Sequence, residues 1–354
     1  MRFRLVFLNG GFITHFTLDS LLTQLSLHLT QQERNLDLLG SSYFRQIGPI
    51  NVTDDTSNTE EKNFGQSVSM SDDGRTIAVS GVCTDLTTGL HFYRVKVFEE
   101  VDNVSWSQKG ASIDSDKTST YLDDARADVS LSGDGLNVAV STVYIKDRDS
   151  SLAADTTPEG SVFVYNFNSS NAWDLASTFS GDDTDGGIPG EYVGLKVSLD
   201  RTGSKVAIGV QYHDGTGGSG GGNQDSGQVL VCTIGDATCQ VIATGTPGDR
   251  VGSSVMISSG SSSSCVVFGS VGSDSNGTDS GSASVLCENN TDGTITWVNR
   301  GVQLVGEAAG DEFGFSVAIS SDSNFIAVGS RLNDPSDDKK DAGHVRVFQL
   351  EPSS

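Results

Sequence analysis

A fivefold internal repeat constrains the fold of this chain more than any other feature of its sequence. In each copy, a short segment with alternating apolar residues precedes a polar turn and a second segment that is continuously apolar. A valine in the first segment recurs at intervals of 58 to 68 residues. Such a period is typical of architectures in which every copy is one supersecondary unit. The marker valines are Val68, Val129, Val197, Val255 and Val317.

The apolar pattern within one copy predicts four short antiparallel strands. The first strand alternates at Val68 and Met70, which indicates one buried face. The second, at 77–79, is continuously apolar and requires cover on both faces. The third returns at 95–97, and an aromatic residue, Trp106 in the first copy, marks the weaker fourth strand. Tandem four-stranded units that need cover on both faces are the blades of a propeller.

The two ends of the repeat region predict how the ring closes. The fifth copy ends at its third strand, 345–349, without a fourth. Residues 43–50 show the aromatic-to-glycine spacing of a fourth strand, in Phe44 and Gly48. They are expected to supply the missing outer strand of the last blade, which would remove an exposed edge. The sequence therefore predicts an all-β fold, a five-bladed β-propeller of four-stranded antiparallel blades, over residues 41–350.

Residues 1–40 are expected to form a short N-terminal extension. Leucines at helical spacing over 18–39 predict a helix there, although those at 25–29 also alternate like a strand. The apolar run at 5–8 is too short for a typical signal peptide. Because no run of about 18 apolar residues occurs, no transmembrane helix is expected.

The composition narrows the classes of partner. The formal net charge is −24, which disfavours nucleic acid, because binding to phosphates depends on Lys and Arg. An anionic membrane surface is disfavoured for the same reason. Apolar residues make up 36% of the chain and glycine accounts for 42 of 354 residues, which favours several small cores over one large one.

Where the first strand of a copy begins and where its second strand ends, the sequence resembles the FG-GAP repeat of integrin-α-type propellers. Phe64-Gly65 and Phe313-Gly314 match the first half of that motif, and 79–81 lies where the second half falls. The second copy lacks Phe-Gly, and the third and fourth have Val-Gly. The resemblance covers residues 43–349 and implies an adhesion-like interaction protein. It also implies a calcium loop between the first two strands, but turns such as 71–74 are too short to surround calcium.

Acidic residues concentrate in the loops expected at one end of the blades. The connections from fourth to first strands and from second to third strands hold 29 of the 46 acids. Long loops on a rigid scaffold are where propellers usually bind, so these acids predict a recognition face for a cationic or calcium-bridged partner. Alternatively, the acids only keep the surface soluble. The acids predicted for this face are Asp54, Asp55, Asp123, Asp124, Asp182, Asp183, Asp185, Asp311, Glu312, Asp337 and Asp338.

We predict a non-enzymatic module that binds a protein or glycan, with no required cofactor, although calcium could occupy the acidic loops. No catalytic residue is predicted. One alternative is a carbohydrate hydrolase that uses carboxylates near the ring axis, and another is a lectin-like structural repeat protein. Acids from different blades that meet in one polar pocket, with raised pKa values, would favour the enzyme.

The cysteines allow two cross-strand disulfides. No C-x-x-C pair occurs, which disfavours a structural zinc site. Cys232 and Cys239 flank a turn, and Cys265 and Cys287 lie on strands expected to be antiparallel neighbours. Two disulfides would leave Cys83 free and would fit an extracellular or cell-surface protein. The alternative is five buried thiols in a reducing compartment.

Overall fold

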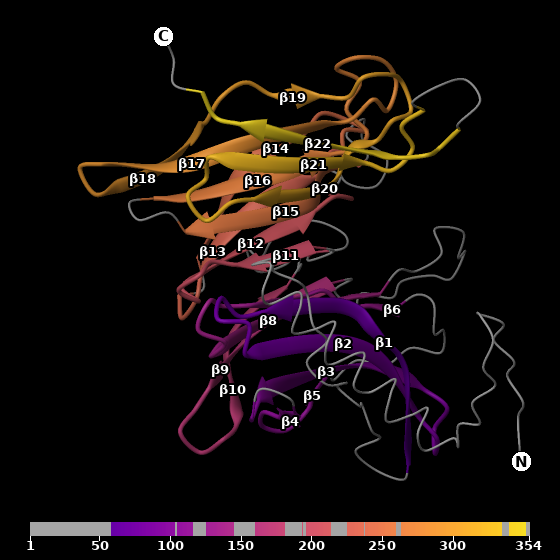
Figure 1. The fold of residues 1–354 in the computed structure, drawn as a ribbon, viewed down its shortest axis with the longest axis vertical. Coiled ribbons are helices and arrows are strands. Elements are labelled where there is room, and N and C mark those ends of the chain that lie inside the picture. Colours follow the sequence, from indigo (N-terminus) through magenta and orange to yellow (C-terminus); the bar gives the residue numbers. More distant parts are fainter. Residues whose placement is uncertain are drawn as a thin grey trace, which may run out of the picture. The chain divides into compact units, whose positions relative to one another are not determined.

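The computed structural model describes residues 58–102, 105–115, 125–144, 160–180, 193, 196–213, 225–236, 238–259, 263–334 and 340–351 (Figure 1). The chain divides into two compact units, Met1–Pro49 and Ile50–Ser354, and every described residue belongs to the second. The helix predicted at 18–39 and the closing strand predicted at 43–50 lie outside the described residues.

The described residues form antiparallel β-sheets, and none of them is in a helix, so the predicted all-β class is confirmed. No segment of this part of the chain meets the length and hydropathy that a membrane-spanning helix requires. Five sheets follow one another along the described sequence (Figure 1). We number these sheets one to five.

Sheet one has the order β1-β2-β3-β4, with β5 beside β3, and sheet two the order β10-β9-β8-β6, with β7 beside β8. The strands of sheet one are β1 (Thr59–Met70), β2 (Thr76–Asp85), β3 (His91–Glu100), β4 (Trp106–Gln108) and β5 (Ile113–Asp114). Those of sheet two are β6 (Ala125–Arg126), β7 (Val129–Leu131), β8 (Asn137–Tyr144), β9 (Gly160–Phe167) and β10 (Trp173–Ser180).

Sheets three and four have the orders β11-β12-β13-β14 and β15-β16-β17-β18, with β19 beside β17, and sheet five has the order β20-β21-β22. The strands of sheet three are β11 (Lys196–Leu199), β12 (Lys205–Val210), β13 (Gln228–Thr233) and β14 (Cys239–Thr244). Sheet four comprises β15 (Val251–Ser259), β16 (Ser264–Ser270), β17 (Ser282–Thr291), β18 (Thr294–Asn299) and β19 (Leu304–Val305). Sheet five comprises β20 (Phe313–Ile319), β21 (Phe325–Ser330) and β22 (His344–Gln349).

Each sheet packs face to face on the next one along the chain. Val95 and Val97 of sheet one pack with the marker valine Val129 and with Leu131 of sheet two. The same arrangement recurs at the other three junctions, where buried residues of both sheets form one apolar cluster. The second strands of sheets one to four are buried on both faces, and β16 is buried along its whole length, whereas Phe325 at the start of β21 in sheet five is 45% exposed. The core is therefore a series of small apolar layers between sheets.

The glycines of the repeated motif lie where adjacent sheets approach most closely. A Cβ atom on Gly269 would lie 1.9 Å from the carbonyl oxygen of Gly314 in the next sheet. In the preceding junction, a Cβ atom on Gly209 would lie 2.1 Å from the carbonyl oxygen of Gly252. Gly252 and Gly314 also have φ of 85° and 96°, a region that favours glycine. The first glycine of one copy thus meets the second glycine of the preceding copy, and no larger residue fits.

Candidate functional site

The structure describes two of the eleven acids predicted for the recognition face, Asp311 and Glu312. The other nine, Asp54, Asp55, Asp123, Asp124, Asp182, Asp183, Asp185, Asp337 and Asp338, lie outside the described residues. Asp311 and Glu312 directly precede β20, in the connection that enters sheet five.

Asp311 is buried, with 2% of its surface exposed. Its Oδ2 accepts hydrogen bonds from the backbone N–H of Glu307 at 3.2 Å and of Ala308 at 2.9 Å. The same oxygen accepts a third bond from Nδ2 of Asn333 at 3.0 Å. Asp311 therefore joins the loop before β20 to the loop after β21, and it shapes these loops instead of offering an accessible carboxylate.

Glu312 joins the same two loops through an ion pair with Arg331. The hydrogen bond from Arg331 to Glu312 raises the pKa of the guanidinium group, which also lies 4.5 Å from the ring centre of Phe315. Glu312 has a φ of 51°, and Asn63 and Arg250, which also stand one residue before the repeated Phe-Gly or Val-Gly, have 53° and 54°. The backbone of this entry turn thus has the same shape in three copies.

A buried charged cluster in sheet one was missed by the sequence analysis. Lys96 and Arg94 are only 1% and 4% exposed. Arg94 makes two hydrogen bonds of 2.7 Å to Asp114 and one of 3.3 Å to Glu61, which also pairs with Lys96 at 2.6 Å. Buried charges of this kind persist only when they are paired. The alternation of charged residues with valines over 94–97 indicated that these charged side chains lie in a buried strand. The sequence does not show which acids pair with them.

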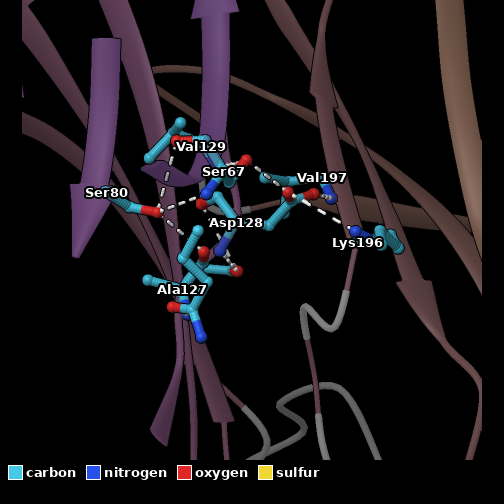
Figure 2. Close-up of polar contacts among 9 residues, drawn as sticks. Ser67, Ser80, Ala127, Asp128, Val129, Lys196 and Val197 are labelled. Carbon is cyan, nitrogen blue, oxygen red and sulfur yellow. Dashed lines mark hydrogen bonds and ion pairs between the residues drawn. The ribbon is translucent and has the colours of Figure 1, made fainter. Parts of the chain in front are cut away.

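Asp128 lies directly before β7 and links the first strand of sheet two to the first strands of sheets one and three (Figure 2). Its Oδ1 accepts a hydrogen bond from Ser67 Oγ of sheet one at 2.8 Å, and its Oδ2 accepts one from the backbone N–H of Val197 of sheet three at 3.2 Å. Nζ of Lys196 lies 3.6 Å from Oδ1. In Figure 2 the carboxylate lies between Ser67 on one side and Lys196 and Val197 on the other.

Hydrogen bonds of one repeated type run between the first strands of successive sheets. The N–H two residues after each marker valine donates to the side chain that follows the marker valine of the preceding sheet. The first strand lies at the edge of its sheet and has N–H groups without a neighbouring strand, which side-chain acceptors of the preceding sheet thus satisfy. The four pairs are Leu131 with Ser69 at 2.9 Å, Leu199 with Ser130 at 2.9 Å, Ile257 with Ser198 at 3.2 Å and Ile319 with Sδ of Met256 at 3.4 Å.

Two observations on the described residues concern the hydrolase alternative. Within them, no three His, Cys, Asp or Glu side chains are arranged to hold a metal ion. The resolved shifts of carboxyl pKa values in this part of the chain are all downward. Hydrogen bonds from Ser71 to Asp73 and from Ser320 to Asp322 cause two of these shifts. A general acid would require the opposite direction.

The cysteines on sheets three and four are oxidised, and one thiol remains. Disulfides join Cys232 to Cys239 and Cys265 to Cys287, in both cases between directly paired residues of neighbouring strands. Cys83 is a buried free thiol, and burial raises its pKa to about 12. A thiol held in the protonated form is a poor nucleophile, so Cys83 serves as a small core residue.

Comparison with known families identifies the last sheet. Residues 306–348 match the family model described as "FG-GAP repeat". This match covers β20, β21 and most of β22. The chain therefore contains an FG-GAP repeat, as the Phe313-Gly314 pair and its spacing predicted. No curated relative matches the chain by sequence.

Solved structures with similar folds share little sequence with this chain. The periplasmic gluconolactonase of Pseudomonas aeruginosa is 13% identical, with 75% of this chain and 64% of that chain covered and a TM-score of 0.43. The β-propeller domain of the trilobed protease from Pyrococcus furiosus is 8% identical, with 84% and 70% covered and a TM-score of 0.42. The haemagglutinin-neuraminidase of parainfluenza virus 5 is 10% identical, with 86% and 80% covered and a TM-score of 0.43. This chain thus spans less than two thirds of the length of the gluconolactonase, and these similarities assign no activity to it.

Proposed function

We propose that this chain is a non-enzymatic FG-GAP propeller that presents an acidic loop face to a protein or glycan, outside the cell or at its surface. The observation that carries the proposal is the series of like-built sheets with one FG-GAP repeat. In the sequence, acidic segments fall between fourth and first strands and between second and third strands, which places them at one end of such sheets. Asp311 and Glu312 support it indirectly, because they hold two of these loops in place. Calcium that bridges acids of neighbouring loops would suit such a face.

The same proposal includes a ring of five blades over residues 41–350, completed by 43–50 as the outer strand of sheet five. Two sheet faces support the closure, because they are uncovered where their equivalents are buried. Val345 and Val347 are 66% and 69% exposed, whereas Val95 and Val97, at the same positions of sheet one, are each 1% exposed. Val68, the marker valine of sheet one, is 64% exposed, whereas the marker valines of sheets two, three and four are buried. Closure would bring these two apolar faces together.

The repeated glycines support the same closure. Each first glycine with a described predecessor contacts the second glycine of that sheet, as Gly314 contacts Gly269. Among the described residues, nothing lies within 4 Å of the Cβ position of Gly65 in sheet one, and Gly329 of sheet five meets only Ser316 of its own sheet. The first and the last sheet therefore each keep one half of a glycine contact that the inner junctions complete.

The test of the recognition face compares two variants. Each loses three aspartate charges, one at the acidic loops and the other at the opposite end of the strands. The full chain is applied to arrays of glycans and of extracellular matrix proteins, with millimolar calcium or with chelator. Replacement of Asp182, Asp183 and Asp185 by Asn should weaken binding to every bound array component by about tenfold or more. If binding is lost in chelator and restored when calcium is added back, calcium bridges the acids to the partner.

The matched control replaces Asp72, Asp73 and Asp322 by Asn, in turns at the opposite end of the strands. The affinity of this control should stay within about twofold of that of the parent, since charges far from an interface contribute little to binding. Equal losses in both variants, or unchanged binding after the loop substitutions, would reject the acidic face.

A further inference from the structure

A cavity lies between sheets three and four, at the end of the strands opposite to the acidic loops. Its volume is about 160 Å³. Sheet three contributes the end of β13 and the start of β14, including Thr233 and Gln240, and sheet four contributes Glu288 of β17 and Trp297 of β18. The residues predicted for the recognition face do not line it, so this cavity is a separate feature of the molecule.

The charges in the cavity compensate each other. Lys205 of sheet three forms an ion pair with Glu288 of sheet four, and the two side chains are 22% and 12% exposed. The other carboxylate oxygen of Glu288 accepts a hydrogen bond from the backbone N–H of Ser264 at 3.2 Å. Because the two charges of the pair cancel, the cavity offers no net attraction to an ionic ligand.

The remaining polar groups are able to bind a neutral ligand. Oε1 of Gln240 accepts a hydrogen bond from the indole N–H of Trp297 at 3.1 Å, which turns the amide so that its NH₂ group is the unused end. Thr233 and Thr238 also line the cavity, and their hydroxyl groups form no hydrogen bond with another described residue. One amide donor and two hydroxyls thus accompany an indole ring and the apolar side chain of Ile295.

Both walls of the cavity are fixed by covalent bonds. The Cys232–Cys239 disulfide closes the hairpin of β13 and β14, and Cys239 itself lines the cavity. The Cys265–Cys287 disulfide joins β16 to β17 directly before Glu288. A site with rigid walls loses little conformational entropy when a ligand binds.

We propose that this cavity binds a single neutral saccharide ring. A pyranose has apolar C–H faces that pack on an aromatic ring, and hydroxyls at its edge that pair with amide, hydroxyl and carboxylate groups. The volume is below the range of about 300–1,000 Å³ that larger ligands use, so it suits one ring, such as the end of a glycan. Lys205 and Glu288 supply one charged donor and one charged acceptor to the ring hydroxyls.

The test uses methyl glycosides of glucose, galactose, mannose and N-acetylglucosamine with the full chain. Saturation-transfer NMR and calorimetry should detect at least one of them with millimolar affinity, typical of one small ring with few contacts. The variants Thr233→Val and Gln240→Ala change exposed side chains and should fold normally, as thermal unfolding will verify. Each should weaken binding by about tenfold, the effect of a lost hydrogen bond.

Three control variants test whether glycoside binding belongs to this cavity. Trp106→Phe alters an outer-strand tryptophan of sheet one, and Thr296→Val alters an exposed threonine of β18 that does not line the cavity. Both should bind the glycoside as the parent does. The variant with Asn at Asp182, Asp183 and Asp185 should also keep this binding, even if it loses its array partners. Absence of binding by every glycoside, or equal affinity in Gln240→Ala and the parent, would overturn the proposal.

Discussion

Asp128 stands directly before the marker valine of the second copy, where the first copy has Ser67 and the third has Lys196. Its carboxylate accepts one hydrogen bond from the preceding sheet and one from the following sheet. The backbone N–H of Val197 has no described alternative acceptor, and an unpaired buried donor costs about 1–3 kcal/mol. The position therefore matters for the contact between sheets, although it lies in no recognisable motif.

Replacement of Asp128 by Ala should lower the free energy of unfolding by about 2–4 kcal/mol, since it removes two hydrogen bonds and leaves a donor unpaired. The matched control is Lys196→Ala, which removes only the ion pair of a side chain that is 46% exposed. That change should cost less than about 1 kcal/mol. Urea denaturation measures both, and equal losses would mean that the hydrogen bonds of Asp128 contribute nothing beyond the ion pair.

The turns between first and second strands form a repeated element in which an aspartate accepts hydrogen bonds from the turn itself. In three copies a serine hydroxyl donates to an aspartate two residues later, in the pairs Ser71–Asp73, Ser132–Asp134 and Ser320–Asp322, at 2.7, 2.6 and 2.5 Å. Each aspartate also accepts a backbone N–H of its own turn. The carboxylates at the expected calcium position are thus engaged in the turns themselves.

These turns should make stability depend on pH in the acid range. Hydrogen bonds from Ser71 and Ser320 hold the pKa values of Asp73 and Asp322 below the ordinary value of 3.8. The unfolded chain therefore binds protons at a higher pH than the folded one, so the stabilisation is present above about pH 3.8 and disappears as the pH falls through the folded pKa values. The variant Asp73→Asn/Asp322→Asn should melt at a lower temperature than the parent at neutral pH, and this difference should close below about pH 3.8.

The control for this pH profile is Asp236→Asn, because the carboxylate of Asp236 forms no hydrogen bond with another described residue. Its melting temperature should follow that of the parent at every pH. A difference between the turn variant and the parent that persists unchanged in acid would assign the effect to packing of the Asn side chains.

At the scale of the whole molecule, the proposed ring makes a prediction about an exposed face. Val347 of sheet five lies at the position of Val97, which sheet two covers. If sheet one covers Val347 in the closed ring, Val347→Asp should lower the free energy of unfolding by about 2–4 kcal/mol, because it would bury an unpaired charge. Equilibrium denaturation of the full chain provides the measurement.

Val302→Asp is the matched control, since Val302 is 84% exposed and belongs to no sheet face. This change should stay within about 0.5 kcal/mol of the parent. If Val347→Asp is equally harmless, the face of sheet five is open to solvent and the ring is not closed by sheet one.

The sequence by itself determined the number of copies, the strand order within a copy and the turn positions. These properties depend on local periodicity and on glycine, which a sequence displays directly. It also indicated which cysteines could meet, because Cys265 and Cys287 lie on consecutive strands. The family match at 306–348 agrees with the Phe-Gly pair found by spacing.

Only the tertiary structure decided which side chains of different sheets contact one another. The burial of Asp311, the charge cluster around Lys96 and the role of Asp128 all depend on partners 22 to 69 residues away in the sequence. Hydrophobic periodicity in the sequence indicates how much of a strand is buried. Which residues of two sheets touch is set by packing in three dimensions. The cavity beside Trp297 has the same origin, since its walls come from two copies that the sequence places 50 to 60 residues apart.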